Sequence, residues 1–150
     1  MRKIEKIIIH CSDSSFGDVA EIRKWHKERG FCDIGYHYVI LNGKRSKEYV
    51  GSEVGMIEKG RADDVVGAHV KGMNSISIGI CMIGVQNFYR RQFWSCLGLV
   101  SQLLRLHNLT VNDVLGHCET PTGKEQGKTC PNFDIDVFRT WLKWFVRLKM

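Results

Sequence analysis

The run at residues 76–83, Ile-Ser-Ile-Gly-Ile-Cys-Met-Ile, constrains the fold most strongly, because it is apolar at nearly every position. A strand with this pattern is buried on both faces, as in the centre of a sheet that helices cover on each side. A second apolar run at residues 4–11 predicts another buried strand. Both runs are too short to cross a membrane, and no other stretch approaches that length.

Helical patterns separate and follow these strands. Asp18 and Glu21 form a capping box that opens a helix ending at about residue 29. The longest helix is expected at residues 90–107. A last helix begins after the capping residue Asp134 and ends at about residue 148. It carries two apolar stripes, one of Ile135, Phe138, Leu142 and Phe145 and another of Val137, Trp141 and Trp144.

The remaining strands complete a mixed sheet. Residues 34–41 predict a strand that the hairpin signal Asn42-Gly43 pairs with residues of about 45–50. Residues 110–115 predict another strand, whereas residues 51–71 are interpreted as a surface loop with at most one short helix. The order of elements indicates an α/β fold, with a mixed central β-sheet flanked by about three helices. We expect residues 1–150 to form a single domain.

Charge and cysteine content indicate which partners and which cellular compartment suit the protein. The net charge of +6 favours a polyanionic partner, such as nucleic acid or an anionic envelope polymer. Solubility alone is the alternative, since the basic residues are scattered. The six cysteines could form three disulfides, but several lie in apolar or helical segments and no secretory signal precedes them. Free thiols in a reducing compartment are therefore expected.

Three side chains are candidate zinc ligands. His10 ends the first apolar run, His117 follows the strand at residues 110–115, and Cys130 lies in the loop beyond. Imidazole and thiolate are ligands that zinc prefers, and three protein ligands with one open position are typical of a catalytic site. The spacing also allows a loop histidine and a buried cysteine without any metal. Cys118 could replace Cys130, but adjacent residues rarely bind one ion in an extended chain, so we prefer Cys130.

Other side chains could assist hydrolysis at such a site. Lys128 precedes Cys130 by two residues, so in an extended segment its ammonium could approach a polarised carbonyl oxygen. Tyr36 and His37 alternate on a strand, so only one faces the cleft, and a tyrosine hydroxyl can orient or deprotonate a water. His69, in a loop, could bind substrate or a metal. A solvated lysine and a core tyrosine are the ordinary alternatives.

These residues fall into segments that resemble the zinc-dependent N-acetylmuramoyl-L-alanine amidases of type 2, which share the fold of peptidoglycan recognition proteins. The sequence is most similar to the short phage lysozymes that are amidases. The similarity runs in order from residue 7 to about residue 140. Its segments are residues 9–12 (Ile-His-Cys-Ser), 22–27 (Ile-Arg-Lys-Trp-His-Lys), 30–40, 66–74, 77–80 (Ser-Ile-Gly-Ile), 116–117 and 128–131 (Lys-Thr-Cys-Pro).

The resemblance implies roles for these residues. His10, His117 and Cys130 would bind one zinc ion, Tyr36 and Lys128 would assist hydrolysis, and His37 and His69 would line the substrate groove. The bond cut would join N-acetylmuramic acid to L-alanine in bacterial peptidoglycan, which suits a lysis enzyme of a phage or prophage. The alternative is a peptidoglycan-binding module without catalysis, but those relatives usually lack the cysteine ligand.

The resemblance also sets expectations about partners. We expect a monomer that binds peptidoglycan or muropeptides, has no membrane span and does not bind nucleic acid. A polymerase partner is implied only by similarity to the phage lysozymes. Without a signal peptide, the protein would stay in the cytoplasm until its release to the cell wall. Two departures stand out: about ten extra residues near 45–60, which should reshape the groove, and Cys118, where many relatives carry a basic or polar residue.

Overall fold

The two apolar runs form the centre of a five-stranded sheet in the computed structural model, which describes residues 2–148. β1 (Lys6–Cys11) and β4 (Ser77–Met82) are parallel neighbours, and β4 is buried at every position. The order of strands is β3-β2-β4-β1-β5. β5 (Val114–Gly116) and β2 (Tyr38–Lys44) continue the parallel pairing, and only β3 (Tyr49–Lys59) is antiparallel. The predicted mixed sheet is confirmed.

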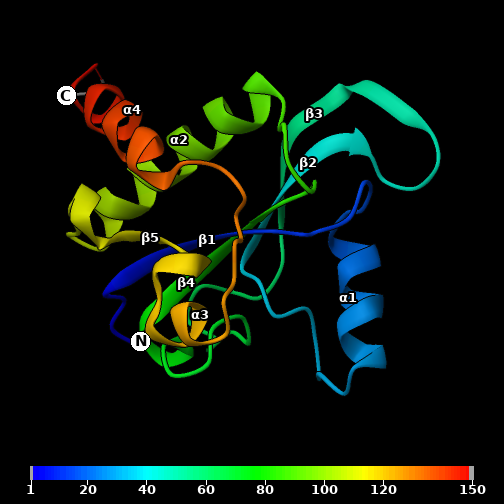
Figure 1. Ribbon diagram of the computed structural model, residues 1–150, viewed down its shortest axis with the longest axis horizontal. Helices are drawn as coiled ribbons and strands as arrows, with labels where there is room; N and C mark the ends of the chain where they lie inside the picture. The colour runs from blue at the N-terminus through cyan, green and yellow to red at the C-terminus, as the bar shows by residue number, and fades with distance from the viewer. Residues whose placement is uncertain (1, 149–150) are drawn as a thin grey trace.

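Helices cover both faces of this sheet (Figure 1). α2 (Arg90–Leu106) and α4 (Ile135–Leu148) lie side by side and share one core with Ile7, Ile9 and Ile80. α1 (Val19–Glu28) covers the other face and packs on Val39 and Cys81. The two cores take alternate residues of the same strands, because successive side chains of a strand point to opposite faces. Each fully buried isoleucine contributes about 1.5–3 kcal/mol of hydrophobic stabilisation.

The predicted helix starts are confirmed by hydrogen bonds. The Asp18 carboxylate accepts from the amide of Glu21 at 2.8 Å and caps α1. The Asp134 carboxylate accepts from the amide of Asp136 at 3.0 Å and caps α4. Both caps satisfy amides that the first turn of a helix leaves unpaired. No helix within residues 2–148 is long and apolar enough to cross a membrane.

The predicted turn at Asn42-Gly43 is wrong. Both residues belong to β2, and the pairing with β3 shifts register on each side of Asn42. Gly43 has a φ of 85°, so these residues form a bulge that a residue with a β-carbon would strain. The chain reverses at residues 45–48 instead, and β3 extends to Lys59 through the segment expected to be a loop.

Arg45 explains why the hairpin is longer than the sequence suggests. Its guanidinium forms ion pairs with Glu53 at 2.9 Å and Glu58 at 2.7 Å, both in β3. It also pairs with Asp18 of the α1 cap at 3.1 Å. The extra residues near 45–60 therefore form the chain reversal and β3, and Arg45 ties them to the start of α1.

The segment from residue 110 to residue 125 also differs from the prediction. A 3-10 turn, η2 (Val111–Asp113), takes up the first half of the strand expected at residues 110–115, and β5 follows it. Two further short elements come next, η3 (His117–Glu119) and α3 (Pro121–Glu125). η1 (Asn74–Ile76) precedes β4. α3 is a fourth helix, where about three were expected.

Candidate metal centre

The three candidate zinc ligands converge at one end of the sheet. β1 and β5 are parallel neighbours, with Ile9 opposite Gly116, so His10 and His117 leave the same edge side by side. Their ring centroids lie 4.7 Å apart. The potential ligand atoms of His10, His117 and Cys130 all lie within 4.8 Å of one another. One ion could contact all three, because zinc binds imidazole nitrogen at about 2.0–2.1 Å and thiolate sulfur at about 2.3 Å.

Backbone contacts hold Cys130 against the two strands. The amide of Cys11 donates to the Cys130 sulfur at 3.0 Å, and the amide of Cys118 donates to the Cys130 carbonyl at 2.8 Å. Gly116 makes the approach possible, since a β-carbon there would lie 2.9 Å from the ring of Pro131. Cys118 is outside the metal-competent group found among the described residues. All six cysteines are free thiols, as expected.

A chain of hydrogen bonds fixes the tautomer of His10. The Ser77 hydroxyl donates to the carbonyl of Met73 at 2.8 Å, so it must accept from Nε2–H of His69 at 3.2 Å. Nδ1 of His69 is then the acceptor for Nε2–H of His10, at 2.8 Å. The free lone pair of His10 is therefore on Nδ1, available to a metal.

His69 lies between the cleft and the sheet rather than at the rim. Two glycines make room for its ring, since a β-carbon at Gly79 would lie 2.7 Å from it and one at Gly67 would lie 2.9 Å from it. His69 still lines the cleft, so the predicted position is partly right, but one ring nitrogen is bonded to His10 and the other to Ser77.

The structure corrects the expectation for His37. Its side chain is fully buried and absent from the cleft lining. Nδ1 accepts from the amide of Gly79 at 3.0 Å, which leaves Nε2–H to donate to the carbonyl of Val65 at 2.8 Å. Both ring nitrogens are used inside the protein, so we remove His37 from the substrate-contacting set. Only one of the two neighbours faces the cleft, as expected, and it is Tyr36, although both residues precede β2 rather than lie in it.

Burial keeps the histidines neutral. It lowers the pKa of His10 well below its usual value, and the neighbouring rings of His69 and His117 add to the effect. Burial and the charge of Lys128 lower the pKa of His117. The hydrogen bond with Cys11 and burial raise the pKa of the Cys130 thiol. A bound cation would reverse this last shift, because metal binding releases the thiol proton.

A cleft of about 610 Å³ opens above these groups and includes Tyr36 and Lys128. The Tyr36 ring lies 5.0 Å from that of His10, and burial raises the pKa of its hydroxyl well above the usual value. Lys128 is exposed at the rim. Arg29 and Lys71 also line the cleft, and neither stands out in the sequence. Their positions depend on where α1 ends and where the loop before η1 folds, which residue spacing does not reveal.

Comparison with known proteins places this arrangement in a family. The family described as N-acetylmuramoyl-L-alanine amidase matches residues 1–133. The endolysin of Escherichia phage T7 is 36% identical over 150 residues, which cover 93% of this chain and 86% of the relative. The amidase LysC from Clostridium intestinale URNW superposes with a TM-score of 0.78 at 24% identity and shares the fold, covering 95% of this chain and 87% of that one. Peptidoglycan recognition protein-LE superposes with a TM-score of 0.65 at 19% identity, covering 88% of this chain and 76% of that one. It was solved in complex with tracheal cytotoxin, a monomeric diaminopimelic acid-type peptidoglycan.

Proposed function

We propose that this chain, which belongs to the N-acetylmuramoyl-L-alanine amidase family, uses one zinc ion to hydrolyse the amide between N-acetylmuramic acid and L-alanine in peptidoglycan. The observation that carries the proposal is the convergence of His10, His117 and Cys130 within 4.8 Å at the floor of the cleft. Residues 1–150 would act as one amidase domain. Because the T7 relative is an endolysin, we further propose that the protein serves a phage or prophage in lysis and acts once released to the wall.

The donor set fits zinc better than a hard cation. Two neutral imidazoles and one thiol are borderline or soft ligands, whereas Mg²⁺ and Ca²⁺ prefer carboxylate and carbonyl oxygens. The hydrogen bond from His10 to His69 gives one ligand the supporting partner typical of metal-binding histidines. When bound, zinc acts as a Lewis acid that polarises a carbonyl and lowers the pKa of water from about 15.7 to about 7.

In this proposal, Tyr36 and Lys128 of the cleft lining assist hydrolysis. The Tyr36 hydroxyl is protonated at neutral pH, as tyrosine ordinarily is, and burial raises its pKa further, so it can orient the attacking water or the amide by hydrogen bonding. The Lys128 ammonium can stabilise negative charge that develops on the substrate carbonyl oxygen. Arg29 and Lys71, at the edge of the same cleft, can attract carboxylates of the stem peptide. His69 holds His10 and therefore acts as a positioning residue.

The test is to incubate purified protein with bacterial sacculi in the presence of zinc and to measure newly freed amino-terminal alanine. We expect release that stops on chelation and returns when zinc is added back. Cys130→Ser should lower the rate more than about 100-fold, beyond the usual effect of changing a group that only supports a ligand. Cys118→Ser is the matched control, since it changes the neighbouring thiol but leaves the three ligands intact.

Two outcomes would count against the proposal. Release of reducing sugar ends in place of alanine would identify a glycosidase. Binding to sacculi without cleavage, even with zinc, would support the non-catalytic module instead.

A further inference from the structure

α4 carries two apolar stripes, and only one of them is covered. Ile135, Phe138 and Leu142 are buried against α2 and the sheet. Trp141 and Trp144, on the other stripe, are 58% and 57% exposed. Val137 and Leu148 are exposed on the same side of the helix, since the spacing of the four residues is 4, 3 and 4. The uncovered stripe therefore runs the full length of α4.

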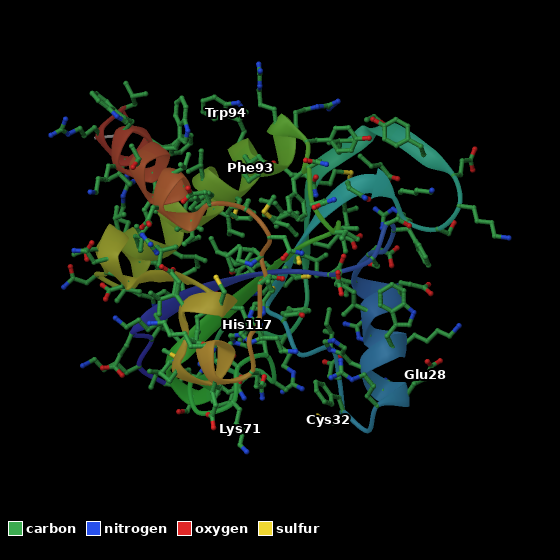
Figure 2. The ribbon with its side chains drawn as sticks, in the orientation of Figure 1. Glu28, Cys32, Lys71, Phe93, Trp94 and His117 are labelled. Atoms are coloured by element: carbon green, nitrogen blue, oxygen red, sulfur yellow. The ribbon has the colours of Figure 1, made fainter. Side chains whose placement is uncertain are left out.

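The exposed apolar surface continues onto α2. Trp94 is 51% exposed, and its ring lies 6.0 Å from that of Phe145 across the two helices. A groove of about 530 Å³ opens between α2 and α4. In Figure 2 the labelled Phe93 and Trp94 lie beside α4, away from His117. Three of the four tryptophans of the chain lie on this surface, which we call the tryptophan face and define as Trp94, Val137, Trp141, Trp144 and Leu148.

The helices that form this face carry much of the positive charge of the protein. Together, α2 and α4 contain six basic residues and one acidic residue, Asp136, which is paired with Arg139 at 2.5 Å. Arg90 lines the groove, and the guanidinium of Arg147 lies 5.6 Å from the centre of the Trp144 ring. No ion pair within residues 2–148 involves Arg90, Lys143 or Arg147. Their charges are thus free to meet an anionic partner.

We propose that the tryptophan face docks on a bilayer surface that contains anionic phospholipids. Tryptophan rings prefer the boundary between headgroups and acyl chains, and a helix with aromatic and basic residues can lie in that boundary without crossing it. Each basic residue near an anionic bilayer contributes about 1 kcal/mol. Charge complementarity and an apolar stripe thus favour the same partner. Nucleic acid would engage the basic residues but would leave Val137 and Leu148 in water.

The geometry leaves the metal cleft accessible during docking. Ile7 and Ile9 of β1 pack toward α2 and α4, so His10, between Ile9 and Cys11, points to the opposite face of the sheet. The cleft lining includes His26 of α1 and no residue of α2 or α4. A protein held at the bilayer by the tryptophan face would therefore present its cleft to a substrate away from the membrane.

The experiment is co-sedimentation of the full chain with vesicles. We expect binding to vesicles of phosphatidylglycerol and phosphatidylcholine, weaker binding at high salt, and little binding to phosphatidylcholine alone. The double variant Trp141→Ser, Trp144→Ser should bind at least about tenfold more weakly while keeping its circular dichroism spectrum. Trp25→Phe, on α1 at the other face of the sheet, is the matched control and should bind like the original protein.

Several results would overturn the proposal. These are equal binding to neutral and anionic vesicles, or no loss of binding in the double variant. A dimer in sedimentation velocity that the double variant abolishes would assign the face to a second copy of this chain. Retention on sacculi that depends on Trp141 and Trp144 would assign it to the wall polymer.

Discussion

Polar side chains are buried around the metal cleft, whereas apolar side chains are exposed on the tryptophan face. In the cleft, His10 bonds to His69, and His69 bonds in turn to Ser77. On the tryptophan face, Trp94 and Trp141 each expose about half of their surface. The buried side chains of His10, His69 and Ser77 hydrogen-bond one another, as burial requires, while Nδ1 of His10 stays available to a metal. An exposed apolar patch of this kind usually marks a site that binds another molecule or a membrane.

Acid should have the largest effect, because it lowers the free energy of unfolding through buried histidines, none of which lies on the tryptophan face. Burial lowers the pKa of His26 and His37 to about 4 and that of His69 to about 3. Below the unfolded value of about 6.5 the unfolded chain binds protons that the folded protein does not, so stability is complete above pH 6.5 and declines as pH falls toward 4. Between pH 6.5 and 5 we expect a loss of about 2 kcal/mol for each histidine in the metal-free protein.

Urea unfolding at each pH measures this loss. Trp141→Ser should show the same dependence on pH, since the tryptophan face contains no histidine. A flat profile between pH 7 and 5 would contradict the buried, neutral state of these rings.

Phe138→Ala should remove the support under the tryptophan face. Phe138 is 3% exposed and belongs to the core shared by α2 and α4. Truncating a buried phenylalanine costs about 3–5 kcal/mol. We expect the urea midpoint to fall accordingly, while zinc affinity of the folded fraction, measured by competition with a chelator, stays unchanged. A parallel loss of zinc affinity would show that the two regions are coupled.

Ser77→Ala should lower the zinc affinity of the cleft, although Ser77 is not itself a candidate metal ligand. The change removes the acceptor that fixes His69, and through it the tautomer of His10. We expect zinc affinity to fall about 10–100-fold, the usual effect of losing such a supporting group. Ser101→Ala is the matched control, because Ser101 also donates to a backbone carbonyl but lies on α2. Equal affinities in the two variants would exclude a positioning role for Ser77.

Val137→Ala should change the free energy of unfolding least. Val137 is 50% exposed, on the same helix as Phe138 but on the uncovered stripe. Exposed substitutions usually change the free energy of unfolding by less than about 0.5 kcal/mol. A loss near that of Phe138→Ala would mean that the stripe is covered in solution, and the urea midpoint measured at two protein concentrations would reveal self-association.

The sequence predicted well the elements that local patterns control. The apolar runs became β1 and β4, and Asp18 and Asp134 cap the helices assigned to them. It failed where a local signal competed with distant contacts. Asn42-Gly43 has the composition of a turn, but the ion pairs of Arg45 with Glu53 and Glu58 favour a longer hairpin.

At the candidate site, too, local sequence signals predicted some features and distant contacts decided the others. The residue types of His10, His117 and Cys130 suggested a metal, and the strand ends suggested where it would lie. The role of His37 was misjudged, because a position in the sequence does not show that both ring nitrogens are bonded to backbone groups. Arg29 and Lys71 were missed because ordinary cations carry no signature until the fold places them beside a cleft.

The sequence by itself determined that the two apolar runs are strands, where the three long helices begin, and that α4 has two apolar stripes. Spacing and capping act between residues a few positions apart, so they can be read directly. Tertiary structure alone decided which stripe is covered and which side chains meet. The bond from His10 to His69 spans 59 residues, and that from Cys11 to Cys130 spans 119. Such contacts depend on the register of the strands and the packing of the helices, which no local pattern specifies.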